Sequence, residues 1–101
     1  MPARVEISGE VARILLSGNS DFSTQSSLAD AMNQAVNAKG VKEIRVDMTD
    51  TTFIDSSVIR SLLKLQEMAV ANGKTLSIWN CNDHIREIFS IGGFDRMFVL
   101  R

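Results

Sequence analysis

The stretch "TDTTFIDSSVIRSLLKL", residues Thr49 to Leu65, decides the fold. Its first half is polar and rich in turn-forming residues, so we predict a loop over Thr49–Asp55. Its second half predicts a helix, because apolar residues recur at three- and four-residue steps, and Asn72-Gly73 closes it. The residues of its apolar side are Val58, Leu62, Leu65 and Ala69, with Ile59 and Leu63 beside them.

The segments on either side of this stretch alternate between strand and helix patterns. Gly9 separates two short apolar runs, around Val5–Ile7 and over Val11–Leu16, which predicts a hairpin. The polar residues 17–24 predict a loop, from whose end, at Ser23 or Thr24, a helix runs toward Gly40. The remaining predicted elements are a strand over 41–48, a strand over 74–81, a helix over 82–93 capped by Asn82 or Asp83, and a last strand over 96–101.

This order, ββαβαβα with a final short strand, predicts an α/β fold with a mixed, mostly parallel sheet. The opening hairpin supplies the antiparallel pair. A length of 101 residues and a hydrophobic fraction of 45% fit a single domain over residues 1–101. Whether the helices cover one face of the sheet or both stays open at this point.

Composition excludes several classes of function. A net charge of −1 lacks the basic excess of nucleic-acid-binding and polybasic membrane-surface proteins. No apolar run approaches the ~20 residues of a transmembrane helix, and charges interrupt the N-terminus where a signal peptide would be apolar. The single Cys81 forms no internal disulfide. We therefore expect a soluble cytoplasmic protein.

Enzymatic chemistry has few candidate residues. Cys81 and His84 are the one thiol–imidazole pair, without a motif around them, and they fall short of a zinc set. Asp21, Asp47 and Asp50 follow predicted strands, where a carboxylate cluster could hold magnesium or accept a phosphoryl group. Turn and cap functions are the more common explanation of such aspartates. We expect no catalytic residue, no bound metal and no cofactor.

Asp55-Ser56-Ser57 allows two interpretations. Asp and Ser are preferred helix-capping residues, so these residues could simply start the helix. Alternatively, Ser56 is a phosphorylation site, because the positive end of a helix favours added negative charge. A phosphate would change the surface potential sharply, and a partner docked there through Phe22, Phe53, Ile54 or Ile59 would have to bury that charge. The second interpretation describes a binding surface that can be switched off.

The ordered motifs resemble the STAS domain, specifically the stand-alone anti-sigma factor antagonists of bacterial partner-switching systems. The resemblance covers nearly the whole chain and rests on four stretches. They are "SGNSD", "IRVDMTDTTFIDSS", "KLQEMAVANGKTLSIWN" and "HIREIFSIGGFDRMF". It implies a mixed sheet with helices packed on one side.

The resemblance also implies a switch at Ser56, the serine directly after the Asp of the motif. A serine kinase, often the anti-sigma factor itself, phosphorylates this serine and a PP2C-type phosphatase removes the phosphate. The unphosphorylated form binds the partner and releases what it held. Asp21, Asp55 and Ser57 match supporting positions beside the serine.

One position departs from the family pattern. Val58 stands where the family usually has Gly, and Ile59-Arg60 follow it. We include Val58 and Arg60 in the predicted partner surface, and the departure points to an output other than a sigma factor, such as biofilm formation or secretion. The alternative is a constitutive interaction module, such as a transport accessory subunit, in which Ser56 only caps the helix. We expect a monomer.

Overall fold

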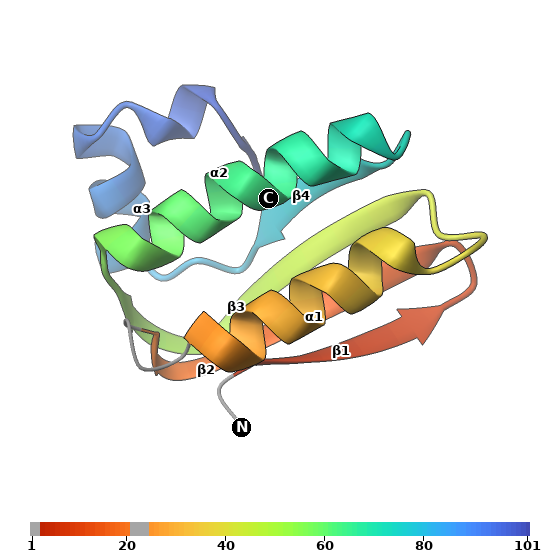
Figure 1. Ribbon diagram of the computed structural model, residues 1–101. Helices are drawn as coiled ribbons and strands as arrows, with labels where there is room; N and C mark the ends of the chain where they lie inside the picture. Colours follow the sequence, from red (N-terminus) through yellow and green to blue (C-terminus); the bar gives the residue numbers. More distant parts are fainter. Residues whose placement is uncertain (1–2, 21–24) are drawn as a thin grey trace.

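The structure, a computed structural model, describes residues 3–20 and 25–101 (Figure 1). The predicted site residues Asp21 and Phe22, and the predicted helix start at Ser23 or Thr24, lie outside these residues. The elements, in chain order, are β1 (Ala3–Ser8), β2 (Val11–Ser20), α1 (Gln25–Asn37), β3 (Glu43–Ile54), α2 (Ser56–Ala71), β4 (Thr75–Trp79), α3 (Asp83–Ile91), a 3-10 helix η2 (Phe94–Arg96) and β5 (Val99–Leu100). None of the described helices is long and apolar enough to cross a membrane.

The five strands form one sheet in the order β1-β2-β3-β4-β5. β1 and β2 form the antiparallel hairpin, turning at Gly9, whose positive φ of 58° suits glycine. The pairs β2–β3, β3–β4 and β4–β5 are parallel. These observations confirm the predicted α/β fold with a mixed, mostly parallel sheet.

The core lies between the sheet and the helices. α1 and α2 run side by side over one face of the sheet, and α3 lies near the start of α2 (Figure 1). Strand β3 shows the alternation that creates this layer: Ile44 and Val46 are fully buried under the helices, while Glu43 and Arg45 remain partly exposed on the opposite face. Helix α2 contributes Val58, Ile59, Leu62, Leu65 and Ala69 to the core, as its periodicity predicts for that apolar side.

Strand replaces the predicted loop over Thr49–Asp55 as far as Ile54, and it also replaces the first part, residues 17–20, of the predicted loop over 17–24. β3 continues to Ile54 and β2 to Ser20, and the two pair in parallel up to the Ser20–Ile54 position, with register shifts on the way. The threonines of this segment are β-branched and favour extended backbone, and the Thr51 hydroxyl donates to the Leu16 carbonyl at 3.0 Å. Asp47 and Asp50 therefore lie within β3 and not after it.

Candidate functional site

Helix α2 begins at a side-chain cap supplied by Asp55. Asp55 has extended backbone, with φ −111° and ψ −178°, and its carboxylate accepts hydrogen bonds from the backbone N–H groups of Ser57 at 3.0 Å and Val58 at 3.2 Å. These are amides that no helical carbonyl can satisfy. The residue that caps the helix is thus Asp55, and the interpretation of Ser56 as a helix cap is corrected.

Ser56 is the first residue of α2 and is exposed. Its hydroxyl makes no hydrogen bond to any residue that the structure describes. The first turn of α2 contains no acidic residue, and Arg60 lies one turn further along, at the i+4 position. The site therefore offers an accessible hydroxyl at the positive end of a helix.

Ser57, in contrast, belongs to a network that joins α2 to α1. Its hydroxyl lies 2.5 Å from Asp55 Oδ1 and accepts from Gln25 Nε2 at 3.2 Å. The Gln25 Oε1 accepts in turn from the Ser61 hydroxyl at 2.9 Å. Sequence reasoning missed Gln25 and Ser61. The four-residue spacing of Ser57 and Ser61 could have indicated a shared polar face, but nothing local identifies Gln25 as its partner.

Hydrogen bonds and a ring contact join the end of β3 to the start of α3. The Asn82 side chain accepts from Ile85 N–H at 2.8 Å, so Asn82 is the cap of α3, and its amide donates to the backbone carbonyls of Thr51 and Thr52. Phe53, which is 40% exposed, stacks on His84 with ring centroids 6.1 Å apart. Phe53 thus presents a supported apolar ring three residues before Ser56.

The predicted partner surface divides into exposed and buried residues. Phe53 and Arg60 are exposed. Ile54, Val58 and Ile59 are at most 6% exposed, because they point into the core below α2. A buried side chain cannot contact a partner without opening the core, so these three residues are removed from the surface. Val58 in place of a glycine consequently adds packing to the core and not side chain to the surface.

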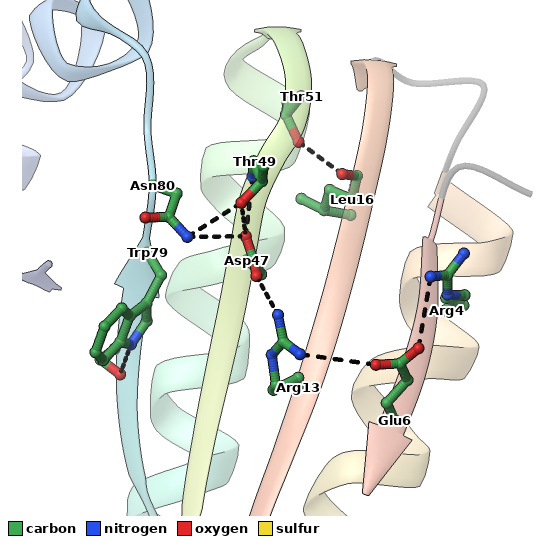
Figure 2. Close-up of polar contacts among 10 residues, drawn as sticks. Arg4, Glu6, Arg13, Leu16, Asp47, Thr49, Thr51, Trp79 and Asn80 are labelled. Atoms are coloured by element: carbon green, nitrogen blue, oxygen red, sulfur yellow. Dashed lines mark hydrogen bonds and ion pairs between the residues drawn. The ribbon is translucent and has the colours of Figure 1, made fainter.

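Asp47 is held in a polar network on the face of the sheet that the helices leave open (Figure 2). Its carboxylate accepts from Arg13 Nη2 at 2.5 Å, from the Thr49 N–H and hydroxyl at 2.9 and 2.6 Å, and from the Asn80 amide at 3.3 Å. Burial alone would raise the pKa of Asp47, but these hydrogen bonds outweigh it and lower the pKa to about 2. The saturated hydrogen bonding favours a structural function for this carboxylate.

The Asp47 network predicts a loss of stability in acid. Since its pKa in the folded state lies below the ordinary value of 3.8, Asp47 stabilises the fold above that value, and the contribution disappears as the pH falls from about 4 to 2. Allowing for the partly exposed Arg13, we expect about 1–2 kcal/mol. Urea unfolding at pH 2 to 7 measures it. In Asp47→Asn the same acid-dependent component should be absent; a parallel pH profile in both proteins would contradict the assignment.

The other polar candidates do not assemble into a metal or thiol site. Within residues 3–20 and 25–101, no group of three or more His, Cys, Asp and Glu side chains could hold a metal ion. Asp50 is exposed on β3. Burial raises the pKa of the half-buried Cys81 thiol, with its sulfur 3.7 Å from that of Met48, which disfavours the reactive thiolate.

The different positions of Asp55 and Ser56 predict different mutational costs. Asp55→Ala removes the cap and should destabilise the protein by about 1 kcal/mol. Ser56→Ala removes an exposed hydroxyl and should stay within about 0.5 kcal/mol of the parent. Urea denaturation of both variants tests this. An equal loss of unfolding free energy in both variants would contradict this prediction, because it would mean that the Ser56 side chain also stabilises the fold.

Known proteins similar to this chain identify its family. Residues 3–101 match the family described as "Mlab, STAS domain". A STAS-domain containing protein of Pseudomonas aeruginosa is 29% identical over 92 residues, covering 91% of this chain and 89% of the relative. The sequence resemblance to the STAS domain is therefore confirmed.

Two solved structures share the fold. The Bacillus cell fate determinant SpoIIAA in its phosphorylated form superposes with a TM-score of 0.74 at 19% identity, covering 98% of this chain and 90% of that one. A sulfate transporter family protein from Wolinella succinogenes gives 0.78 at 18%, covering 94% and 80%. At these identities the similarity shows the fold alone. With the match over residues 3–101, the chain belongs to the STAS domain family.

Proposed function

We propose that this chain is a phosphorylation-switched binding protein of a bacterial partner-switching pathway, acting in the cytoplasm, with Ser56 as the residue that is phosphorylated. The unphosphorylated form binds a serine kinase of the anti-sigma type or an equivalent regulator. A PP2C-type phosphatase restores this form. The observation that carries the proposal is the position of Ser56: exposed, without a hydrogen bond to the described residues, and first in α2 directly after the cap.

The helix start tolerates a phosphate on Ser56. A phosphoserine carries roughly −1.5 to −2 charges at neutral pH. Charge of this sign near the first turn of a helix is favourable by about 0.3–1 kcal/mol. Arg60, at i+4, is an exposed cation within reach of that face of the helix. Phosphorylation would thus leave the fold intact while it changes the surface.

The same phosphate would prevent docking. Phe53 is an exposed apolar side chain three residues before Ser56, and in this proposal the partner covers both residues. An interface formed around a neutral hydroxyl has no group to pair with a doubly charged phosphate, and burying an unpaired charge costs several kcal/mol. Asp55 and Ser57 support the switch by fixing the first turn of α2 through the cap and the Gln25 link.

Relatives support this proposal by analogy. The fold neighbours include an anti-sigma factor antagonist described in an unphosphorylated and a phosphorylated form. Both share the fold of this chain along nearly its whole length. A phosphorylation switch is therefore compatible with the architecture.

Labelling with radioactive ATP in extract of the native cells tests the proposal. The purified protein should incorporate phosphate, Ser56→Ala should incorporate none, and Ser57→Ala should remain a substrate. Circular dichroism of both variants controls for folding. Incorporation that survives in Ser56→Ala, or that disappears only in Ser57→Ala, would overturn the assignment of the site.

A second candidate function is constitutive binding, as in a transport accessory module. The similarity to a sulfate transporter family protein favours it. In this case no condition leads to phosphorylation, and substitution of Ser56 by Ala or Asp leaves binding unchanged. The labelling experiment separates the two functions.

A further inference from the structure

Two adjacent hollows lie between α1 and α2, the helices that lie side by side in Figure 1. The first, of about 290 Å³, lies next to the start of α2, and the second, of about 180 Å³, continues along the two helices. They share Gln25, Ser61 and Lys64 in their linings. We call this surface the α1–α2 groove.

The groove is positively charged. Arg60 and Lys64 line it, both exposed, and neither forms an ion pair with any residue that the structure describes. Among the residues that the structure describes, no acidic side chain lines either hollow. Neither cation lies in the last turn of α2, where a positive charge would be stabilising. Their placement therefore contributes little to stability of the free chain.

The remaining lining is satisfied or apolar. Gln25 and Ser61 are hydrogen-bonded to each other, so they hold the two helices in place and leave the cations as the unpaired groups. The second hollow adds the partly exposed Met68, with the exposed Ala29 on its rim, while Met32 forms its buried floor at 4% exposed. Methionine side chains adapt to varied apolar partners. The groove thus combines two cations with one adaptable apolar side chain, Met68.

We propose that the α1–α2 groove binds an acidic segment of the protein partner, with Asp or Glu side chains on Arg60 and Lys64 and an apolar side chain against the partly exposed Met68. The complementarity of charge selects this occupant over a neutral or basic one. The inference rests on the proposed function, because it adds a second contact region beside the Ser56 switch. Arg60 lies next to both regions, because it follows Ser56 by one helical turn and lines the first hollow.

Photocrosslinking in the native cells tests the groove. The photoreactive residue p-benzoylphenylalanine replaces Ala29 on the rim, and a control replaces Asn37, an exposed residue of α1 that lines neither hollow. Mass spectrometry then identifies the crosslinked peptide. We expect a product at position 29, absent at position 37, whose partner peptide is rich in Asp and Glu.

Charge reversal inside the groove tests the two cations, and an equal charge reversal outside the groove is the control. In the position-29 protein, Arg60→Glu with Lys64→Glu should reduce the crosslink at least tenfold. Lys39→Glu with Arg96→Glu changes the net charge equally, on exposed residues outside the groove, and should leave the crosslink unchanged. A crosslink to a second copy of this chain, a peptide without acidic residues, no excess over position 37, or an equal loss in both double variants would each overturn the groove proposal.

Different results would contradict the proposed Ser56 switch and the proposed α1–α2 groove. If Ser56→Asp abolishes partner binding while position 29 gives no crosslink, the switch stands and the groove is wrong. If position 29 captures an acidic peptide equally in the parent and in Ser56→Asp, the groove stands and the switch is wrong.

Discussion

Ser56→Asp is expected to abolish recovery of the protein partner, whereas Ser56→Ala recovers as much partner as the parent. The aspartate places a fixed negative charge at an exposed position that lies within the proposed partner surface. A buried, unpaired charge costs about 3 kcal/mol, which corresponds to roughly a hundredfold loss of affinity. Affinity purification from native cells with quantitative mass spectrometry measures both variants against the parent, and the partner is the protein lost with Ser56→Asp alone.

The control is an equal charge change elsewhere on α2. Ser56→Asp should not weaken the fold, because an acidic residue in the first helical turn is stabilising. Glu placed at the exposed Val70, in the last turn of α2, adds one negative charge far from the switch and should leave recovery unchanged. Equal recovery with Ser56→Ala and Ser56→Asp would contradict the proposed function and favour constitutive binding.

Ile54→Ala is expected to destabilise the protein by about 3 kcal/mol, while its neighbour Phe53→Ala costs about 1 kcal/mol or less. Ile54 is 1% exposed at the end of β3, so truncation leaves a cavity in the core. Phe53 is 40% exposed and loses mainly its stacking with His84. Urea denaturation of the two variants measures the difference.

In the affinity purification, partner recovery should fall more in Phe53→Ala than in Ile54→Ala, which is the opposite of their order in stability loss. Phe53→Ala removes an exposed apolar contact beside Ser56 and should reduce partner recovery. Ile54→Ala, measured well below its unfolding midpoint, should retain recovery, because its side chain faces the core. If loss of binding followed Ile54 and spared Phe53, the assignment of the surface to the exposed residues would be contradicted.

Much of the fold could be predicted from patterns that local sequence carries. The apolar periodicity of α2, the glycine turn of the hairpin and the Asn72-Gly73 stop all appear in the structure as predicted. The extension of β3 to Ile54 could not be predicted, because it depends on pairing with β2 over polar residues. The sequence of a polar, threonine-rich segment is typical of a loop, and the segment becomes a strand only because a neighbouring strand forms hydrogen bonds with its backbone.

The candidate site was only partly predictable for the same reason. The Asp-Ser-Ser motif locates the helix start, but only backbone geometry shows that Asp55 is the cap and that Ser56 is left open. Gln25 is separated from Ser57 by 32 positions, so its link between α1 and α2 has no local signal. Ile59 belongs to the predicted apolar side of α2 and also to the predicted surface; the structure assigns it to the core.

Phosphopeptide mapping of the protein isolated from its native cells tests the central claim most directly. Trypsin cleaves after Arg45 and Arg60, so one peptide, residues 46–60, contains Ser56, Ser57 and the threonines of β3. Fragment ions between Ser56 and Ser57 assign the phosphate. We expect a phosphate on Ser56 whose occupancy changes with growth conditions. Full coverage of this peptide without phosphate under every condition, or a phosphate confined to another of its residues, would contradict it.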